Sequence, residues 1–154
     1  MSLSGFANSS GRAPRGGDTL HPLTDELITA VLAARGFSVS PDRDGDLVGR
    51  WGDNLIYFLR LGEHGELFQV RTLAATRFDI EDVPRLYTFC NTWNHDRLWP
   101  KAFVHVDDFG VARICGEVAA DLACGVTMAQ LDQLCMCGIT AGCQLAAAAA
   151  ELQP

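Results

Sequence analysis

Three of the six cysteines of this chain lie close together, in the stretch LCMCGITAGC at positions 134–143. Thiols at such spacing occur in zinc sites, in redox pairs and in packed helices. At about 100° and 1.5 Å per residue of helix, Cys135 and Cys137 point to nearly opposite sides, and Cys143 lies about 12 Å from Cys135 along the axis. No two of these thiols can share a tetrahedral metal or form a disulfide. We therefore predict a packed helix, with no metal and no cofactor.

The same helix contains two glycines, Gly138 and Gly142, on its apolar stripe. A glycine in a helix interior costs about 1 kcal/mol relative to alanine. A pair spaced by four residues on the buried stripe therefore indicates that another element approaches the helix closely. We predict that Gly138 and Gly142 form part of a packing or dimer face, with the sheet as the neighbour.

Other motifs with the letters of an active site lack the partners that the chemistry needs. The segment DRDGD at 42–46 has its glycine two places too early for a calcium loop, and we predict a solvated turn. The DFG at 108–110 lacks the other motifs of a kinase. His105 and Cys115 could touch across a hairpin, but no oxyanion hole or orienting carboxylate accompanies them. We predict no catalytic residues and a non-enzymatic protein.

Composition points to one folded domain. The chain has 154 residues, of which 48% are hydrophobic and 20% charged, and a formal net charge of -7. This acidity argues against nucleic acid as a partner. No long apolar run and no leader are recognisable, so we expect a cytoplasmic location and no membrane partner. We also expect the cysteines to be free thiols. We predict a flexible tail over 1–20 and one α+β domain over 21–154.

Periodicity and turn signals predict three helices and six strands. The helices are expected at 24–35, 80–95 and 127–152, and the strands at 37–40, 46–51, 54–61, 66–74, 101–107 and 111–118. The last two strands must place their small and β-branched residues on one core face, which requires a three-residue loop at 108–110. This register puts Lys101 opposite Glu117.

The strand at 54–61 is apolar on both of its sides. Leu55, Tyr57 and Leu59 point one way, and Phe58 points the other way with Ile56. Three helices can cover only one face of such a sheet, so we predict a homodimer, with Leu55, Tyr57, Phe58 and Leu59 in the dimer or packing face. The tail or the first strand could instead cover the exposed side.

The densest group of aromatic and polar residues is NTWNHDRLWPK at 91–101. Aromatic and amide side chains near a loop are common in binding sites. We predict that Asn91, Asn94, Trp99 and Lys101 contact a partner, and that Trp93 anchors the second helix to the core.

The stretch from Phe89 to Cys135, FCNTWNHDRLWPKAFVHVDDFGVARICGEVAADLACGVTMAQLDQLC, closely resembles the YbjN-type domain family. The resemblance rests on Asn91 and Asn94 at a helix end, on the hairpin that follows, and on the Gly-Val-Thr step from Gly125 to Thr127 before the last helix. It covers roughly residues 20–150. It implies an antiparallel sheet with helices mainly on one face, in the order α-β-β-β(-β)-α-β-β-α, similar to type III secretion chaperones. It also implies the family's label, sensory transduction regulator, and supplies no catalytic residues.

Together these observations predict a dimeric, non-enzymatic domain that binds a segment of another protein in a chaperone-like or regulatory role. The alternative is an unrecognised enzyme or a small-ligand-binding protein. A thermal-shift screen against metals, nucleotides and small acids separates the two, because a ligand that binds the folded state raises the melting temperature.

Overall fold

The computed structural model describes residues 19–154, so the predicted tail falls almost entirely outside the described part of the chain. The helices are α1 (Asp25–Ala34), the short 3-10 helix η2 (Ile80–Asp82), α2 (Val83–Asp96) and α3 (Met128–Ala150). The strands are β1 (Ser40–Pro41), β2 (Leu47–Trp51), β3 (Asn54–Leu61), β4 (Leu67–Leu73), β5 (Lys101–Val106) and β6 (Ala112–Asp121). This order confirms the predicted α+β fold class, with four strands before the second long helix.

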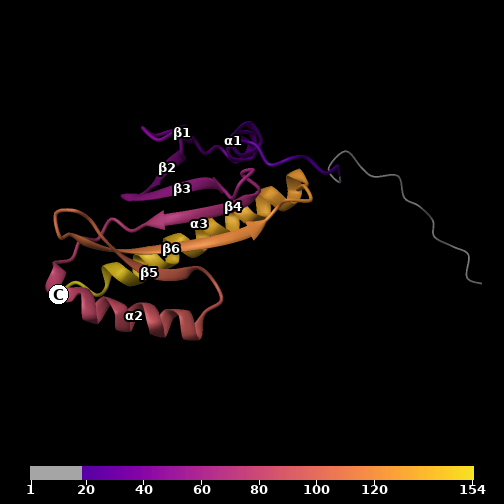
Figure 1. Ribbon diagram of the computed structural model, residues 1–154. Helices are drawn as coiled ribbons and strands as arrows, with labels where there is room; N and C mark the ends of the chain where they lie inside the picture. Colours follow the sequence, from indigo (N-terminus) through magenta and orange to yellow (C-terminus); the bar gives the residue numbers. More distant parts are fainter. Residues whose placement is uncertain (1–18) are drawn as a thin grey trace, which may run out of the picture.

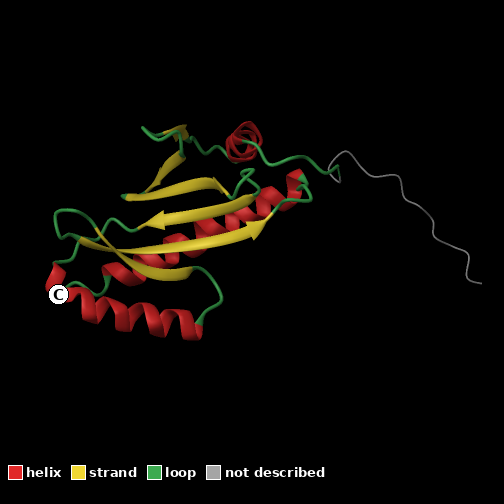
Figure 2. Cartoon of the chain, viewed as in Figure 1, coloured by secondary structure: helices red, strands yellow, loops and turns green. Residues whose placement is uncertain are grey.

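The strands form one six-stranded antiparallel sheet in the order β1-β2-β3-β4-β6-β5. Helix α3 runs diagonally across one face of this sheet, with α1 near one end of it and α2 along the opposite edge (Figure 1). All three long helices contribute buried apolar residues to the core on one face of the sheet. Figure 2 shows the helices in red and the strands of the sheet in yellow. The other face carries no helix in the part of the chain that the structure describes.

Two clusters of buried residues fill the space between the sheet and the helices. One lies under α1 and includes Ile28, Phe58 and Leu131, and the other lies over α2 and includes Leu86 and Ile114. Helix α3 contributes to both clusters and is therefore the central element of the core.

Local signals begin and end the helices where the sequence predicts. Thr24 caps α1, because its hydroxyl oxygen accepts the Leu27 N–H at 3.1 Å, and Gly36 follows the helix with φ +82°. Thr127 and Gln130 form a reciprocal capping box at the start of α3. These caps fix where α3 begins and hence which of its residues meet the sheet.

The glycine prediction is confirmed, with β4 as the close neighbour. A Cβ added to Gly138 would lie 2.5 Å from the Cβ of Val70, and one added to Gly142 would collide with Thr72. Both glycines are buried. Their missing side chains therefore allow α3 to lie directly on β4.

The predicted hairpin register is also confirmed, since Lys101 pairs with Glu117 and His105 with Arg113. The first strand was predicted wrongly at 37–40, because the structure has only the two-residue β1. The Phe37 N–H donates to the Leu32 carbonyl and thereby completes the end of α1, so this apolar segment serves the helix rather than the sheet. Strand β6 continues to Asp121, past the predicted end at residue 118.

By length and composition, the 23-residue helix α3 could cross a membrane. In this fold its residues Leu131, Cys135 and Leu145 are almost completely buried in the domain core. Core helices of globular domains commonly have this composition. The property is therefore weak evidence for a membrane span.

Candidate functional site

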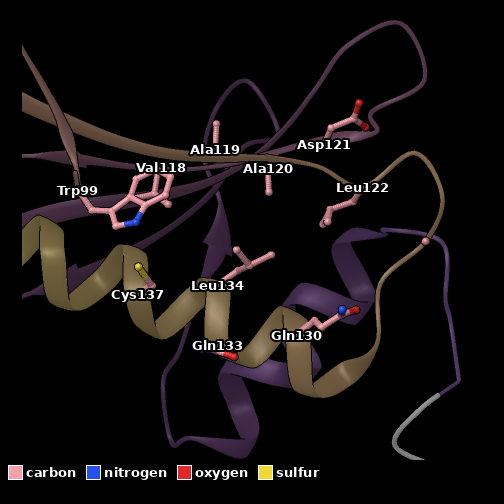
Figure 3. Close-up of a pocket in the computed structure, with 11 residues that line it drawn as sticks. Trp99, Val118, Ala119, Ala120, Asp121, Leu122, Gln130, Gln133, Leu134 and Cys137 are labelled. Atoms are coloured by element: carbon pink, nitrogen blue, oxygen red, sulfur yellow. The ribbon is translucent and has the colours of Figure 1, made fainter.

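A groove lies between β6 and α3. Its volume is about 540 Å³, and we call it the β6–α3 groove. Figure 3 shows the end of β6 on one side, the first turns of α3 on the other, and Trp99 near one end. Its lining residues are Trp99, Val118, Ala119, Ala120, Asp121, Leu122, Gly125, Gln130, Gln133, Leu134 and Cys137.

The alternation of β6 decides which of its side chains enter this groove. Ala120 and Leu122 point toward α3, whereas Ala119 and Asp121 point away from it (Figure 3). Because the side chains facing α3 are small at position 120 and only half-buried at position 122, space remains between the strand and the helix. The helix side of the groove carries Leu134 and Cys137.

Trp99 borders the groove and is 43% exposed. It follows α2 and forms a cis peptide bond with Pro100, which is buried. The preceding tryptophan, Trp93, is buried and donates its indole N–H to the Pro100 carbonyl at 3.1 Å. This confirms that Trp93 anchors α2, and it leaves Trp99 as the exposed tryptophan of the segment 91–101.

The other predicted partner-binding residues lie apart from the groove lining. Asn94 donates to the Ala102 carbonyl at 2.9 Å and accepts the Ala102 N–H at 2.7 Å, so its amide binds the outer edge of β5. Asn91 is exposed on α2. Lys101 begins β5 and lies 3.7 Å from Glu117 on the helix-free face. Of the four predicted residues, Trp99 alone lines the groove.

The helix-free face of the sheet carries an apolar row across four strands. Leu55 pairs with Leu73, Leu73 with Cys115, and Cys115 with Phe103. Cys115 is buried although it belongs to neither core cluster, and the other three are half-buried. The four residues together form what we call the apolar row.

A charged row runs beside the apolar row. Tyr57, Arg71, Glu117 and Lys101 are consecutive partners across the same four strands. Arg71 and Lys101 lie 3.6 Å and 3.7 Å from Glu117. The Arg71 guanidinium also donates to Gln69 at 2.7 Å. Long polar side chains thus cover part of this face by themselves.

The predicted dimer or packing residues divide between the two faces. Leu55, Tyr57 and Leu59 lie on the helix-free face, as the strand alternation requires. Phe58 points into the core and is 1% exposed, and both Gly138 and Gly142 are buried against β4. Phe58, Gly138 and Gly142 therefore have a packing role. On the helix-free face, Leu59 is buried at 6% exposure, whereas Leu55 and Tyr57 are half-buried.

The buried thiols are poorly suited to nucleophilic chemistry. Burial raises the pKa of Cys115 and Cys135 to about 12 and that of Cys90 to about 11. Only the thiolate attacks carbonyls or binds metals, so these thiols stay protonated near neutral pH. Cys135 packs in the first core cluster, as predicted for a small buried hydrophobe.

A comparison with protein families gives one match. The family described as "Putative bacterial sensory transduction regulator", YbjN, matches residues 24–151, which is most of the chain. The chain belongs to the YbjN family. The match confirms the resemblance found in the sequence.

Solved structures support the YbjN fold. The crystal structure of Escherichia coli YbjN, titled a "putative transcription regulator", superposes with a TM-score of 0.69 at 14% identity, over 83% of this chain and 91% of the other. An uncharacterized protein from Methanothermobacter thermautotrophicus gives a TM-score of 0.57 at 12% identity, over 84% and 98% of the two chains. At these identities the likeness concerns the fold. No curated protein matches the chain.

Sequence reasoning missed most of the groove in this YbjN domain. Residues 119–122 have weak strand propensity, so local propensity does not predict that β6 extends beyond residue 118. Pairing with β4 keeps these residues extended, since Leu67 lies opposite Asp121. A signal was available in the family resemblance, whose pattern places an acidic strand end at Glu117 to Leu122.

Proposed function

We propose that this protein is a non-enzymatic, regulatory or chaperone-like domain that binds a segment of another protein, and that it works in the cytoplasm as a homodimer. The β6–α3 groove is the main support for protein binding. Its lining is mainly apolar, contains one thiol, and has an exposed tryptophan at one end. Tryptophan and apolar side chains dominate the energetics of protein interfaces.

The charge of the protein supports the same class of partner. A formal net charge of -7 favours a basic protein segment over a nucleic acid. The groove also opens along a strand, so a ligand longer than the cavity can continue out of it.

The homodimer proposal is supported by the helix-free face. Its apolar row of Leu55, Leu73, Cys115 and Phe103 lies beside the charged row. An apolar centre with a polar rim is the common anatomy of protein interfaces. A twofold copy could bury the apolar row and leave the charged row at the rim.

Light scattering at micromolar concentration tests the dimer. We expect twice the chain mass of 16.7 kDa for the natural sequence and the single mass for Leu55→Glu. Phe109→Glu is the matched control, because Phe109 is 92% exposed at a hairpin tip outside the apolar row. It should remain dimeric. A single mass for the unsubstituted protein would rule out the dimer.

Affinity capture tests protein binding. The natural sequence and Phe109→Glu should retain the same protein from a lysate of the encoding organism, whereas Cys137→Phe, which fills the groove, should lose it. Capture that is indifferent to Cys137→Phe would remove the groove from the proposal.

A second candidate, a small-ligand-binding protein, has one observation in its favour. The groove volume of about 540 Å³ lies in the range of small-molecule sites. A thermal-shift screen that finds a metabolite whose effect is abolished by Cys137→Phe would favour this alternative.

A further inference from the structure

Strand β6 extends beyond its neighbour β5 at the groove. The β5–β6 pairing ends where Lys101 meets Glu117, but β6 continues to Asp121 and stays paired with β4 on its other side. Residues 118–121 therefore have one strand neighbour in the described structure. We call this stretch the free edge of β6.

Two backbone hydrogen bonds show which backbone groups of β6 point to the free edge. In an antiparallel strand, the N–H and C=O of one residue face the same side, and successive residues alternate. The Leu122 N–H donates to the Glu66 carbonyl and the Ile114 carbonyl accepts the Ala74 N–H, so even-numbered residues face β4. The backbone groups of Ala119 and Asp121 consequently face away from β4, at the free edge.

The chain before β5 leaves this edge uncovered because it passes beneath the sheet. A Cβ added to Gly116 would lie 2.7 Å from the Cγ of Pro100, which places Pro100 against the helix-covered face. Trp99 precedes it and borders the groove instead of pairing with β6. The line that β5 would follow, if it were longer, is therefore open.

Hollows lie on both faces of the sheet near the end of β6. The β6–α3 groove lies on the helix side, and a hollow of about 210 Å³ lies on the other side. Both are lined by Ala119, Ala120 and Asp121, and the second also by Leu61 and Leu67, which are 39% and 38% exposed. An extended peptide projects successive side chains to opposite faces, so a strand added at the free edge would direct alternate side chains to the β6–α3 groove and to the helix-free face.

We propose that the free edge binds an extended, basic segment of a partner protein as an added antiparallel strand in line with β5. Strand addition of this kind takes affinity from backbone hydrogen bonds and specificity from alternate side-chain pockets. The backbone of the segment pairs with Ala119 and Asp121. This inference rests on the proposed protein-binding function.

The alternation of β6 gives the segment a sequence pattern. The residue opposite Asp121 lies on the helix-free face beside a carboxylate and is basic. The next residue, opposite Ala120, points into the groove and is apolar. The third, opposite Ala119, points to the helix-free face, and the fourth, opposite Val118, is apolar and points to the helix side near Trp99. In chain order the pattern is basic, apolar, any residue, apolar.

Charge favours such a segment over a second copy of this chain. Two copies that paired through Ala119 and Asp121 would each bring an acidic residue to the junction, where like charges repel and a cation would be favourable. A partner with a basic residue supplies that cation.

The test uses labelled peptides that carry this pattern, with the full chain and fluorescence anisotropy as the readout. Cys137→Phe should weaken binding by about tenfold or more, because it removes the pocket for the apolar side chain. Replacing lysine by glutamate in the peptide should weaken binding to the natural sequence, and Asp121→Lys should reverse that preference. Phe109→Glu should bind as the natural sequence does.

Two measurements do not depend on the folding of a variant. A peptide with an ester in place of the amide that donates to the Ala119 carbonyl should bind about fivefold more weakly. Bound peptide should slow the reaction of Cys137 with a thiol reagent but leave the exposed Cys124 unchanged, since Cys124 lies outside the groove lining.

Several results would overturn the inference. No peptide of this pattern would bind with a Kd below about 1 mM, the ester peptide would bind as tightly as the amide peptide, or bound peptide would not slow the reaction of Cys137. A dimer mass in light scattering that Asp121→Lys, and not Leu55→Glu, reduces to the single mass would also overturn it. If these peptides do not bind but Cys137→Phe still abolishes capture of a protein, the protein-binding proposal is retained and strand addition is rejected. If capture is also indifferent to Cys137→Phe, both fail.

Discussion

Replacing Gly138 by alanine tests how closely α3 lies against the sheet. The new Cβ would lie 2.5 Å from the Cβ and 2.6 Å from the Cγ1 of Val70 on β4. Non-bonded carbon atoms prefer about 3.5–4.0 Å, so the helix and the strand must separate locally by about 1 Å. The Cβ of Val70 is fixed to the backbone, and a change of rotamer cannot relieve this contact.

Two opposite effects set the size of the change. Alanine in place of glycine gains about 1 kcal/mol of helix stability, whereas overpacking a core costs about 1–3 kcal/mol. We expect a net loss of about 1 kcal/mol in the free energy of unfolding. In a domain of this size that lowers the melting temperature by about 2–4 °C.

Urea unfolding followed by far-ultraviolet circular dichroism measures this loss. Thr140→Ala is the control, because Thr140 is exposed on the same helix and its replacement should stabilise the protein by about 0.5 kcal/mol. The sign of the change in the free energy of unfolding for Gly138→Ala distinguishes the two effects. If Gly138→Ala is more stable than the natural sequence, only helix propensity is at work and the close approach of α3 to Val70 is refuted.

Two further predictions concern a hydrogen-bonded amide and the buried thiols. Asn94→Ala should lower the free energy of unfolding by about 1–3 kcal/mol, because it leaves both backbone groups of Ala102 without their partner. Asn91→Ala is the control and should change the free energy of unfolding by less than about 0.5 kcal/mol. Equal values for the two variants in urea unfolding would contradict this role of Asn94. The free energy of unfolding should also fall as the pH rises above about 9. In the folded protein, raised pKa values of about 11 for Cys90 and about 12 for Cys115 and Cys135 keep these thiols neutral. In the unfolded chain the same thiols ionise above about pH 9, which stabilises the unfolded state. Urea midpoints between pH 8 and 11 measure this fall, and its slope should be smaller in Cys135→Ala.

The sequence predicts the elements well because local chemistry determines them. Thr24 and Thr127 mark the helix starts through capping, and the parity of apolar residues in the last hairpin requires the pairing of Lys101 with Glu117. The close contact of Gly138 with the sheet follows from the cost of glycine in a helix. Each of these inferences needs only neighbouring residues or a fixed period.

The groove and the assignment of faces depend on contacts between distant elements. Both sides of β3 are apolar, so the sequence could not show that Phe58 faces the helices while Leu55 does not. The free edge exists because β6 is held by β4 beyond the start of β5. That difference in length arises from the course of the chain around Pro100, which no local pattern in the sequence reveals.

The position of α3 across both core clusters affects how the chain acquires its structure. Its residues Leu131 and Cys135 pack in one cluster, and Leu145 and Ala149 pack in the other. The strands and the two other long helices precede it in the chain, so neither half of the core is complete until α3 docks. Such contacts between distant segments slow folding and leave the apolar face of the sheet exposed to solvent in the meantime. A folding intermediate without docked α3 would therefore present an open sheet, which makes that intermediate the state most prone to aggregation.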